Sequence, residues 1–305
     1  MDSRNDVRDF LATRRARITP GQAGLASYGK RRVPGLRREE VAVLAGVSTD
    51  YYAQLERGNL AGVSDSVLDA IAGALQLDEA ERTYLYDLAR AAHPSPRTRR
   101  RPSHKRIRPV VQRILDGMTE FPAIVVNERL DVLSSNRLAR ALYSPVFADP
   151  SPPVNLARFC FLNAEAKALY PQWDEAADTV VAMLRTAAGR NPYDRDLSDL
   201  VGELSTRSET FRDRWARHNV RLHRAGAKHF HHPVVGDLTL AFEVLDLSAD
   251  SGLTITIYSA EPQSPSQDAL TFLASWAATL DQQIPKSSPQ NEAEAQHVNE
   301  ISGGK

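Results

Sequence analysis

The sequence predicts a multidomain α + α/β protein, in which an all-helical domain precedes a domain that mixes helices with strands. Three observations predict this class. The chain has 305 residues, which is more than one small core needs and enough for two. Its first ninety residues carry helical periodicity, whereas strand-like alternation begins only beyond residue 120. Between these regions, the segment 94–102 combines three prolines with a basic run, which stops a helix and stiffens an exposed connector.

The first domain, placed at residues 1–93, is expected to consist of five helices. Each is predicted from apolar residues spaced three or four apart, because such residues share one face of a helix. Three of the helices are expected over Asp6–Arg17, residues 64–75 and Asp78–Ala92. The other two lie within Arg38–Arg57.

The stretch Arg38–Arg57 has the pattern of two short helices joined by a tight turn. Val41, Ala42 and Ala45 share one face of the first helix, and the small side chain of Ala42 lets the two helices cross closely. Gly46 then turns the chain sharply, because glycine adopts a positive φ without a steric penalty. The pattern therefore predicts a helix-turn-helix.

The second helix of this motif is expected to begin after Ser48, whose hydroxyl is a good N-cap. Tyr52 and Leu55 point back at the first helix, so a short polar face points outward, formed by Thr49, Asp50, Ala53, Gln54 and Arg57. Such a face suits the major groove of duplex DNA. Two helices joined by a glycine turn also occur in proteins that do not bind DNA, so the flanking sequence has to decide.

The flanking charge favours DNA. Arg31, Arg32, Arg37 and Arg38 precede the first helix of the motif, where a phosphate would also be stabilised. Residues 1–108 contain 20 Lys and Arg against 13 Asp and Glu, and the remaining residues contain 18 against 25. A neutral chain therefore has a basic half and an acidic half, and the attraction to a polyanion is concentrated at the motif.

The groove geometry assigns roles to these residues. The N-terminal part of a recognition helix enters the groove first, which places Thr49, Asp50 and Gln54 against base edges. Gln54 would pair with adenine and Asp50 with cytosine N4, although Asp50 could instead support the helix start electrostatically. Phosphate contacts are expected from Arg37, Arg38, Ser48, Tyr51, Arg57 and Asn59. A homodimer would present two recognition helices about 34 Å apart to double-stranded DNA with a near-palindromic operator.

The second domain is placed at residues 107–283, between a basic linker (94–106) and a tail (284–305) that is expected to be disordered. Helices are expected over Ile107–Gly117, 136–143, 155–188, 194–218 and 267–280. Strands are expected over Ala123–Val126, Leu130–Ser134, Val220–His223, Lys228–His231, Leu238–Leu245 and Leu253–Ser259. An antiparallel sheet flanked by helices can leave a cavity between its face and the helical cover.

Both domains resemble known families. The residues GLRREEVAVLAGVSTDYYAQLERG (35–58) resemble the repressor/Cro-type (Xre) helix-turn-helix domain. RRVPGLRREEVA at its start, together with FRDRWARHNVRLHRAGAKHFHHPVVGDLTLAFEVL (211–245), resembles the regulators that carry an MmyB-like ligand-binding domain. This resemblance extends to about residue 280. It implies a Cro/repressor-like DNA-binding domain followed by a PAS-like antiparallel-sheet domain with helical cover, which would hold a small apolar molecule such as a fatty acid.

Four residues are candidates for contact with that ligand. Trp215, His218, Phe230 and His232 form an aromatic and imidazole group near the expected strands. The alternative is that they are ordinary core aromatics and hydrogen-bonded histidines. Zinc is not expected, because no cysteine or carboxylate completes a tetrahedral set with the histidines at close spacing. No cofactor is expected to be required.

Other features argue against membrane, secreted and enzyme classes. No run of 18 apolar residues is present, and the charged start does not have the pattern of a signal peptide. The single cysteine, Cys160, suits a reducing cytoplasm. Residues 24–31 have P-loop spacing, but Arg31 replaces the hydroxyl that would hold Mg²⁺.

We therefore expect a cytoplasmic transcription regulator. The alternatives are a DNA-binding protein whose second domain only dimerises or recruits a partner, and an enzyme fused to a regulatory head.

Overall fold

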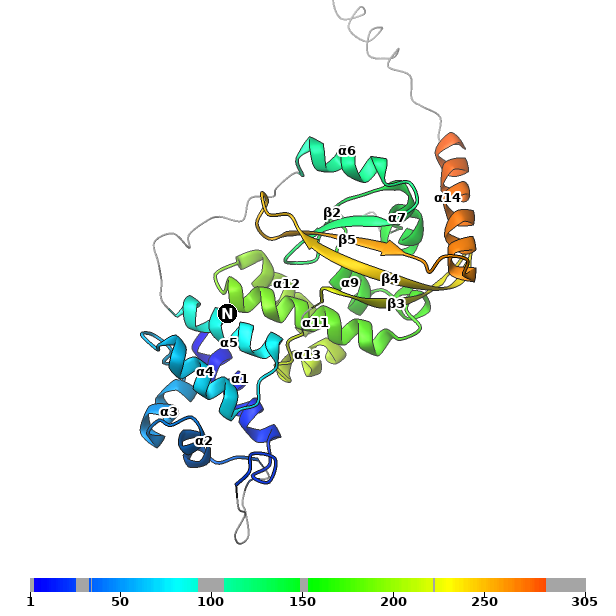
Figure 1. The fold of residues 1–305 in the computed structure, drawn as a ribbon. Coiled ribbons are helices and arrows are strands. Elements are labelled where there is room, and N and C mark those ends of the chain that lie inside the picture. Colours follow the sequence, from blue (N-terminus) through cyan, green and yellow to red (C-terminus); the bar gives the residue numbers. More distant parts are fainter. Residues whose placement is uncertain are drawn as a thin grey trace, which may run out of the picture.

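The computed structural model describes residues 3–25, 33, 35–92, 107–148, 153–221 and 223–283. The predicted linker (94–106) and tail (284–305), and most of the P-loop-like stretch 24–31, lie outside the described residues. Figure 1 shows two parts that pack against each other. We call residues 3–92 the helical domain and residues 107–283 the sheet domain.

The helical domain contains α1 (Ser3–Arg17), α2 (Arg38–Leu44), α3 (Thr49–Glu56), α4 (Asp65–Ala74) and α5 (Glu79–Ala91). Ser48, Ser64 and Asp78 cap α3, α4 and α5, because each side chain accepts a hydrogen bond from the backbone N–H three residues later. The ring of Phe10 meets Tyr84 edge-on at the centre of the core, with ring centroids 5.1 Å apart. The helix ends and buried faces therefore follow the capping residues and the apolar spacing of the sequence.

The sheet domain alternates helices with strands. Its helices are α6 (Pro109–Gly117), α7 (Arg137–Leu142), α8 (Ser144–Phe147), α9 (Leu156–Leu162), α10 (Glu165–Leu169), α11 (Trp173–Arg190), α12 (Arg195–Arg207), α13 (Glu209–Ala216) and α14 (Pro265–Gln283). Its strands are β1 (Ala123–Asn127), β2 (Val132–Ser135), β3 (Ala225–His232), β4 (Gly236–Asp246) and β5 (Leu253–Ser259). The strands form one antiparallel sheet in the order β2-β1-β5-β4-β3.

Both faces of this sheet are covered by helices, but by different ones. On one face, α6 packs Leu115 against Val125 of β1 and Ile255 of β5. On the opposite face, which we call the inner face, α7 and α14 pack against the sheet, and Leu273 and Phe242 belong to the same apolar cluster. Buried and exposed residues alternate through the middle of β4, as the sequence predicts. The helix α11 lies between this domain and the helical domain (Figure 1).

Three predicted elements were wrong in their extent. The helix expected over 155–188 is divided into α9, α10 and α11, because Pro171 forces Tyr170 into an extended conformation between the last two. The helix expected over 194–218 is divided at Ser208, which ends α12 and caps α13. The described residues of the strand expected over Val220–His223 form no strand, and Val220 packs instead into the core of the helical domain.

The two domains meet around Arg185 of α11. The side chain of Arg185 is only 1% exposed. Its Nη1 donates to Asp6 Oδ1 of α1 at 3.2 Å, and its Nη2 donates to the carbonyl oxygen of Trp215 at 2.5 Å. The guanidinium also stacks 3.7 Å above the ring of Trp215. One buried cation therefore joins α1, α11 and α13.

Other polar contacts surround Arg185. Arg14 of α1 donates to the carbonyl oxygen of His218 at 2.5 Å, and Arg190 Nε lies 3.4 Å from Asp87 Oδ2 of α5. Such polar interfaces are typical of domains that can shift relative to each other.

Gly189 permits the closest approach between the domains. A Cβ atom at this position of α11 would lie 2.3 Å from Cε2 of Tyr84, which is closer than any real side-chain contact. Tyr84 is itself packed in the core of the helical domain, so its ring has little room to move. The absence of a side chain at Gly189 is therefore required for α11 to lie against α5.

We expect Gly189→Ala to destabilise the protein by about 1–3 kcal/mol, as overpacked sites do. Gly202→Ala is a matched control on α12, because no atom lies within 4 Å of its added Cβ. That variant should be stabilised by up to about 1 kcal/mol through helix propensity. Urea unfolding of both variants measures the difference, and equal effects would contradict the close packing at α5.

Candidate functional site

The turn between α2 and α3 is set by backbone geometry. Gly46 has φ of 65°, in the left-handed region that favours glycine. Val47 N–H then donates to the carbonyl oxygen of Ala42 at 2.9 Å, which closes the turn after α2. Ser48 Oγ accepts from the N–H of Tyr51 at 3.1 Å and starts α3. The turn and the cap that the sequence predicts are both present.

The outward face of α3 is polar and turned away from the sheet domain. Thr49, Asp50 and Gln54 are exposed, and α2 and α3 lie at the far end of the helical domain in Figure 1. Ala53 was expected on this face but is buried, with 8% of its surface exposed. The buried Glu56 lies three residues further along α3, on the same side of the helix as Ala53. The exposed reading face is therefore narrower than the sequence predicts.

Glu56, at the end of α3, holds the motif to α1. Its side chain is 1% exposed and accepts at Oε1 from Nη2 of Arg15 at 2.7 Å, while Oε2 accepts from Nε of Arg38 at 2.5 Å. This hydrogen bond and the negative charge of Glu56 raise the pKa of Arg38. The sequence analysis missed Glu56, whose only signal is its position one residue after the buried Leu55.

The residues predicted at phosphates lie around the two ends of α3. Arg37, Arg38 and Thr49 line a surface hollow beside the start of α3, and Arg37 also pairs with Glu39 at 3.2 Å. Ser48 is exposed and Tyr51 is half-buried on the first turn of α3. Arg57 and Asn59 are both exposed beyond its C-terminal end. Apart from the half-buried Tyr51, the residues predicted at phosphates are therefore exposed to solvent.

Two of the four ligand candidates lie at the interface between the domains. Trp215 stacks on Arg185 and on Phe211. His218 is buried with a positive φ of 52°, and its Nε2 lies 3.8 Å from Asp9 Oδ2 of α1. Burial and the nearby Arg185 lower the pKa of His218 to about 4, so its ring is neutral at neutral pH.

The other two candidates are packed in the core on the inner face. Phe230 meets Tyr143 edge-on, with ring centroids 5.6 Å apart. His232 is 1% exposed, and its Nε2 lies 2.9 Å from the carbonyl oxygen of Ala141. Trp215, His218, Phe230 and His232 were expected at a ligand, and none of them is among the residues that line the cavity described next.

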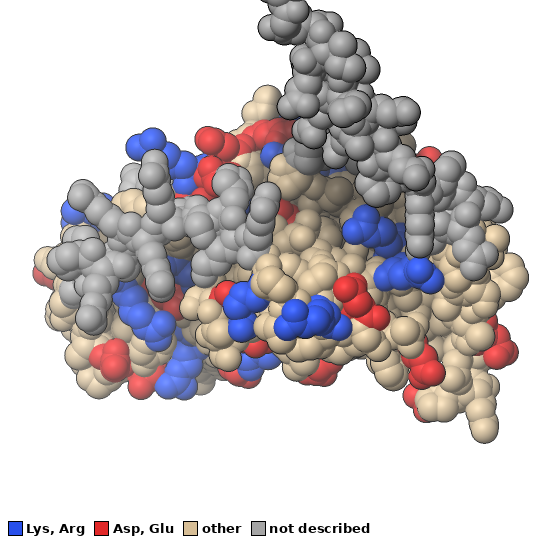
Figure 2. All heavy atoms as spheres, turned by 90° about the horizontal axis from the view of Figure 1, so that it is seen from above, with Lys and Arg blue, Asp and Glu red and all other residues tan. Residues whose placement is uncertain are grey.

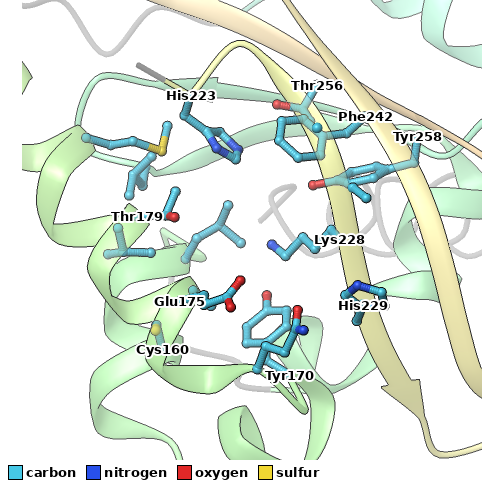
Figure 3. Close-up of a pocket in the computed structure, with 18 of the residues that line it drawn as sticks. Cys160, Tyr170, Glu175, Thr179, His223, Lys228, His229, Phe242, Thr256 and Tyr258 are labelled. Carbon is cyan, nitrogen blue, oxygen red and sulfur yellow. The ribbon is translucent and has the colours of Figure 1, made fainter. Parts of the chain in front are cut away.

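A cavity of about 260 Å³ lies between α11 and the inner face of the sheet. Its apolar wall includes Ile124, Val126, Leu156, Val180 and Met183. Its polar lining includes Lys228, Tyr170, Glu175, Thr179 and Tyr258, several of which point into the same space in Figure 3. A cavity in which an apolar wall faces converging polar groups has the character of a small-molecule site.

A second cavity of about 250 Å³ adjoins the first. The two share Leu130, Met183, Arg221 and His223 in their walls. The second cavity extends along α11 to Arg190, the residue that pairs with Asp87 of the helical domain. One helix therefore lines both cavities and also contacts the helical domain.

The sequence analysis assigned none of the residues that line this cavity to a ligand, and Lys228 is the one with the clearest signal. It lies on β3 opposite Leu240 of β4, and two residues before the buried Phe230. Successive residues of a strand alternate between faces, so Lys228 and Phe230 share the inner face. The available sequence signal was the position of Lys228 two residues before the apolar Phe230, which places both on one face of a strand.

Neither the charged side chains that Figure 2 shows nor the potential metal ligands of the described residues gather into a cluster. Figure 2, seen from the side of α6 and α14, shows acidic and basic side chains interspersed on that face. Among the described residues, no group of three or more His, Cys, Asp or Glu is placed to hold a metal ion. No helix in the described parts of the chain is long and apolar enough to cross a membrane.

Comparison with known protein families gives two matches. Residues 107–273 match the MmyB-like transcription regulator ligand binding domain, which is more than half of the chain. Residues 7–85 match a helix-turn-helix domain. The two matches fall on the sheet domain and on the helical domain. A comparison with curated proteins gave no match.

We expect Glu56→Gln to destabilise the protein by roughly 1–3 kcal/mol, because a neutral amide at this buried position turns an NH₂ group towards the guanidinium of Arg15 or Arg38. Glu39→Gln is the control, since the Arg37–Glu39 pair is exposed and such pairs contribute less than about 1 kcal/mol. Urea unfolding compares the two variants. A loss for Glu56→Gln no larger than for Glu39→Gln would contradict the role of Glu56.

The lowered pKa of His218 predicts a loss of stability in acid. The unfolded protein takes up a proton near pH 6.5 and the folded ring only near pH 4. Stability is therefore lost as the pH falls from about 6.5 towards 4. His218→Asn, which tolerates the positive φ, should lose up to about 2 kcal/mol less than the wild type between pH 7 and 5. Urea unfolding at both pH values tests this, and parallel losses would show that His218 is not responsible.

Proposed function

The chain belongs to the transcription regulators that join a helix-turn-helix domain to an MmyB-like ligand-binding domain, and from this premise we propose that it is a homodimer whose binding to a near-palindromic operator depends on a small apolar ligand. The exposed polar face of α3 is the observation that supports sequence-specific reading most directly. Thr49, Asp50 and Gln54 are free of the domain core and accessible to a groove. In this proposal they contact base edges.

The phosphate contacts of this proposal surround the reading face. Arg37 and Arg38 lie beside the start of α3, with Ser48 and Tyr51 on its first turn, while Arg57 and Asn59 follow its end. Contacts on both sides of a recognition helix fix its register on the duplex without reading sequence. In Arg38, Nε already donates to Glu56, so only the other guanidinium nitrogens are left to contact a phosphate.

The ligand of this proposal occupies the cavity between α11 and the inner face of the sheet. A fatty acid is one candidate, because the walls are largely apolar. The helix α11 supports a route from ligand to DNA, since Met183 lines the cavity while Arg185 and Gly189 contact the helical domain. A ligand that shifts α11 would favour one arrangement of the two domains, and the DNA affinity would change accordingly.

The dimer follows from the size of the reading face. One short recognition helix contacts only a few base pairs, and a symmetric pair of helices doubles the sequence that is read. In this proposal no catalytic step is required. Native mass spectrometry of the purified protein would show both the dimer and any small molecule that remains bound. A ligand-free monomer that also fails to bind genomic DNA fragments would contradict the proposal.

We expect Gln54→Ala and Arg57→Ala to affect DNA binding differently. Gln54→Ala should relax the preference at one base position and cost about 1–3 kcal/mol on the preferred site. Arg57→Ala should weaken all sequences alike and reduce the salt slope by about one. Fluorescence anisotropy with a selected operator and its single-base variants, at several salt concentrations, distinguishes the two. An unchanged base preference in Gln54→Ala would show that the reading face is assigned wrongly.

A further inference from the structure

One apolar residue of the sheet domain is buried in the core of the helical domain. Val220 is 7% exposed and belongs to the same apolar cluster as Phe10 and Tyr84. It lies in the segment that joins α13 to β3, whose described residues are 217–221 and 223–224. We call these described residues the connecting segment. Burial of Val220 therefore attaches the connecting segment to the helical domain.

Polar contacts to α1 hold the same part of the connecting segment. Nη2 of Arg14 donates to the carbonyl oxygen of His218 at 2.5 Å. Nη2 of Arg17 donates to Oδ1 of Asn219. The two residues that precede Val220 are thus bound by the helix that also forms the core around it.

The other end of the connecting segment reaches the two cavities of the sheet domain. His223 lines both of them, and its ring points into the first (Figure 3). This ring stacks on Phe242 of β4, with centroids 4.4 Å apart and 25° between the ring planes. The carbonyl oxygen of Arg224 accepts from the N–H of Val244 at 2.7 Å, which fixes this end to β4. Burial lowers the pKa of His223 to about 4, so the stacked ring is neutral at neutral pH.

The two ends of the connecting segment are close together. Val220 and His223 are separated by at most about 11 Å, because an extended chain spans no more than about 3.6 Å per residue. Among the described residues, the backbone of 219–221 and of His223 forms no hydrogen bond to another backbone group. Such a segment opens more easily than a helix or a strand. Its two side-chain contacts therefore support each other, because each holds the segment in place for the other.

We propose that the connecting segment couples the cavities to the helical domain, with His223 as the residue that an occupant displaces and Val220 as the residue that holds the helical domain. The proposal rests on the ligand-responsive function proposed above and specifies how that function is regulated. A molecule that extends from one cavity into the other has to pass His223, because its ring lies in the wall of both. Displacing the ring from Phe242 removes one of the two contacts, and the helical domain is then held less firmly.

The coupling is reciprocal, so a change at Val220 has to alter binding in the cavities. Val220→Ala removes two methyl groups from the core of the helical domain, and Val220 lines neither cavity. We expect this variant to bind an apolar probe about fivefold more tightly than the wild type, because the segment opposes the probe less. Val41→Ala is the matched control, since it removes the same two groups from the same core but on α2. Its affinity for the probe should not change.

The test uses full-length protein from which bound small molecules have been removed. Calorimetry measures the affinity for 1-decanol as the probe, and mass spectrometry measures hydrogen exchange of α1 without it. Val220→Ala and His223→Ala should each raise the exchange rate of α1 roughly 5- to 30-fold. The double variant should raise it by less than the product of the two single changes, because the two contacts depend on each other.

Two further variants separate coupling from a general loss of packing. His223→Phe keeps a neutral ring that can stack on Phe242, so it should restore the slow exchange of α1. His231→Ala is the control for truncation, because His231 is exposed and lines neither cavity. It should leave the exchange of α1 unchanged.

Either of two results would overturn the proposal. Equal affinities of Val220→Ala and Val41→Ala for 1-decanol would show that the connecting segment does not oppose the probe. Unchanged exchange of α1 in His223→Ala would show that this ring is not coupled to the helical domain, and this measurement decides alone if 1-decanol binds to none of the proteins.

DNA binding is measured on the same preparations. A wild type that binds DNA while its variants give either of these results contradicts this inference alone. A wild type that binds no DNA contradicts the proposed function.

Discussion

The buried guanidinium of Arg185 is the interaction on which the arrangement of the two domains depends. A charge that is almost completely removed from solvent has to be paired, and here the partners are Asp6 of α1 and the carbonyl oxygen of Trp215. Asp6 belongs to the helical domain and Trp215 to the sheet domain, so satisfying one side chain fixes the helical domain against α11 and α13. The same helix forms a wall of both cavities. The lining of both cavities and the contact between the domains therefore involve a single element.

The contrast between Arg185 and Lys228 shows how this protein uses buried charge. Arg185 and Glu56 each have partners on other helices, and each joins elements that apolar packing alone would leave free to slide. Lys228 has aromatic neighbours but no acceptor. Paired charges hold the fold in one arrangement, whereas the half-buried Lys228 faces a cavity.

The two domains also differ in how firmly they are held. Inside the helical domain, Glu56 and an apolar core fix α1, α2 and α3 relative to each other. Between the domains, the contacts are mainly ion pairs and hydrogen bonds to backbone carbonyls, together with the close approach of Gly189 to Tyr84. The helical domain is therefore held together by its apolar core, and it meets the sheet domain through polar contacts and one close helix approach.

The sequence by itself determined the features that depend on residues close together in the chain, such as helix starts and turns. Ser48, Ser64 and Asp78 specify helix starts because they bond to N–H groups three residues away, and Gly46 specifies a turn through its own φ. The alternation through Leu238–Leu245 likewise predicted β4. Tertiary structure decided what depends on distant partners. Trp215 and His218 lie at the domain interface because Arg185 and Arg14 bind their carbonyl oxygens. Lys228 faces a cavity because α11 covers β3, and no local pattern records where a separate helix will pack.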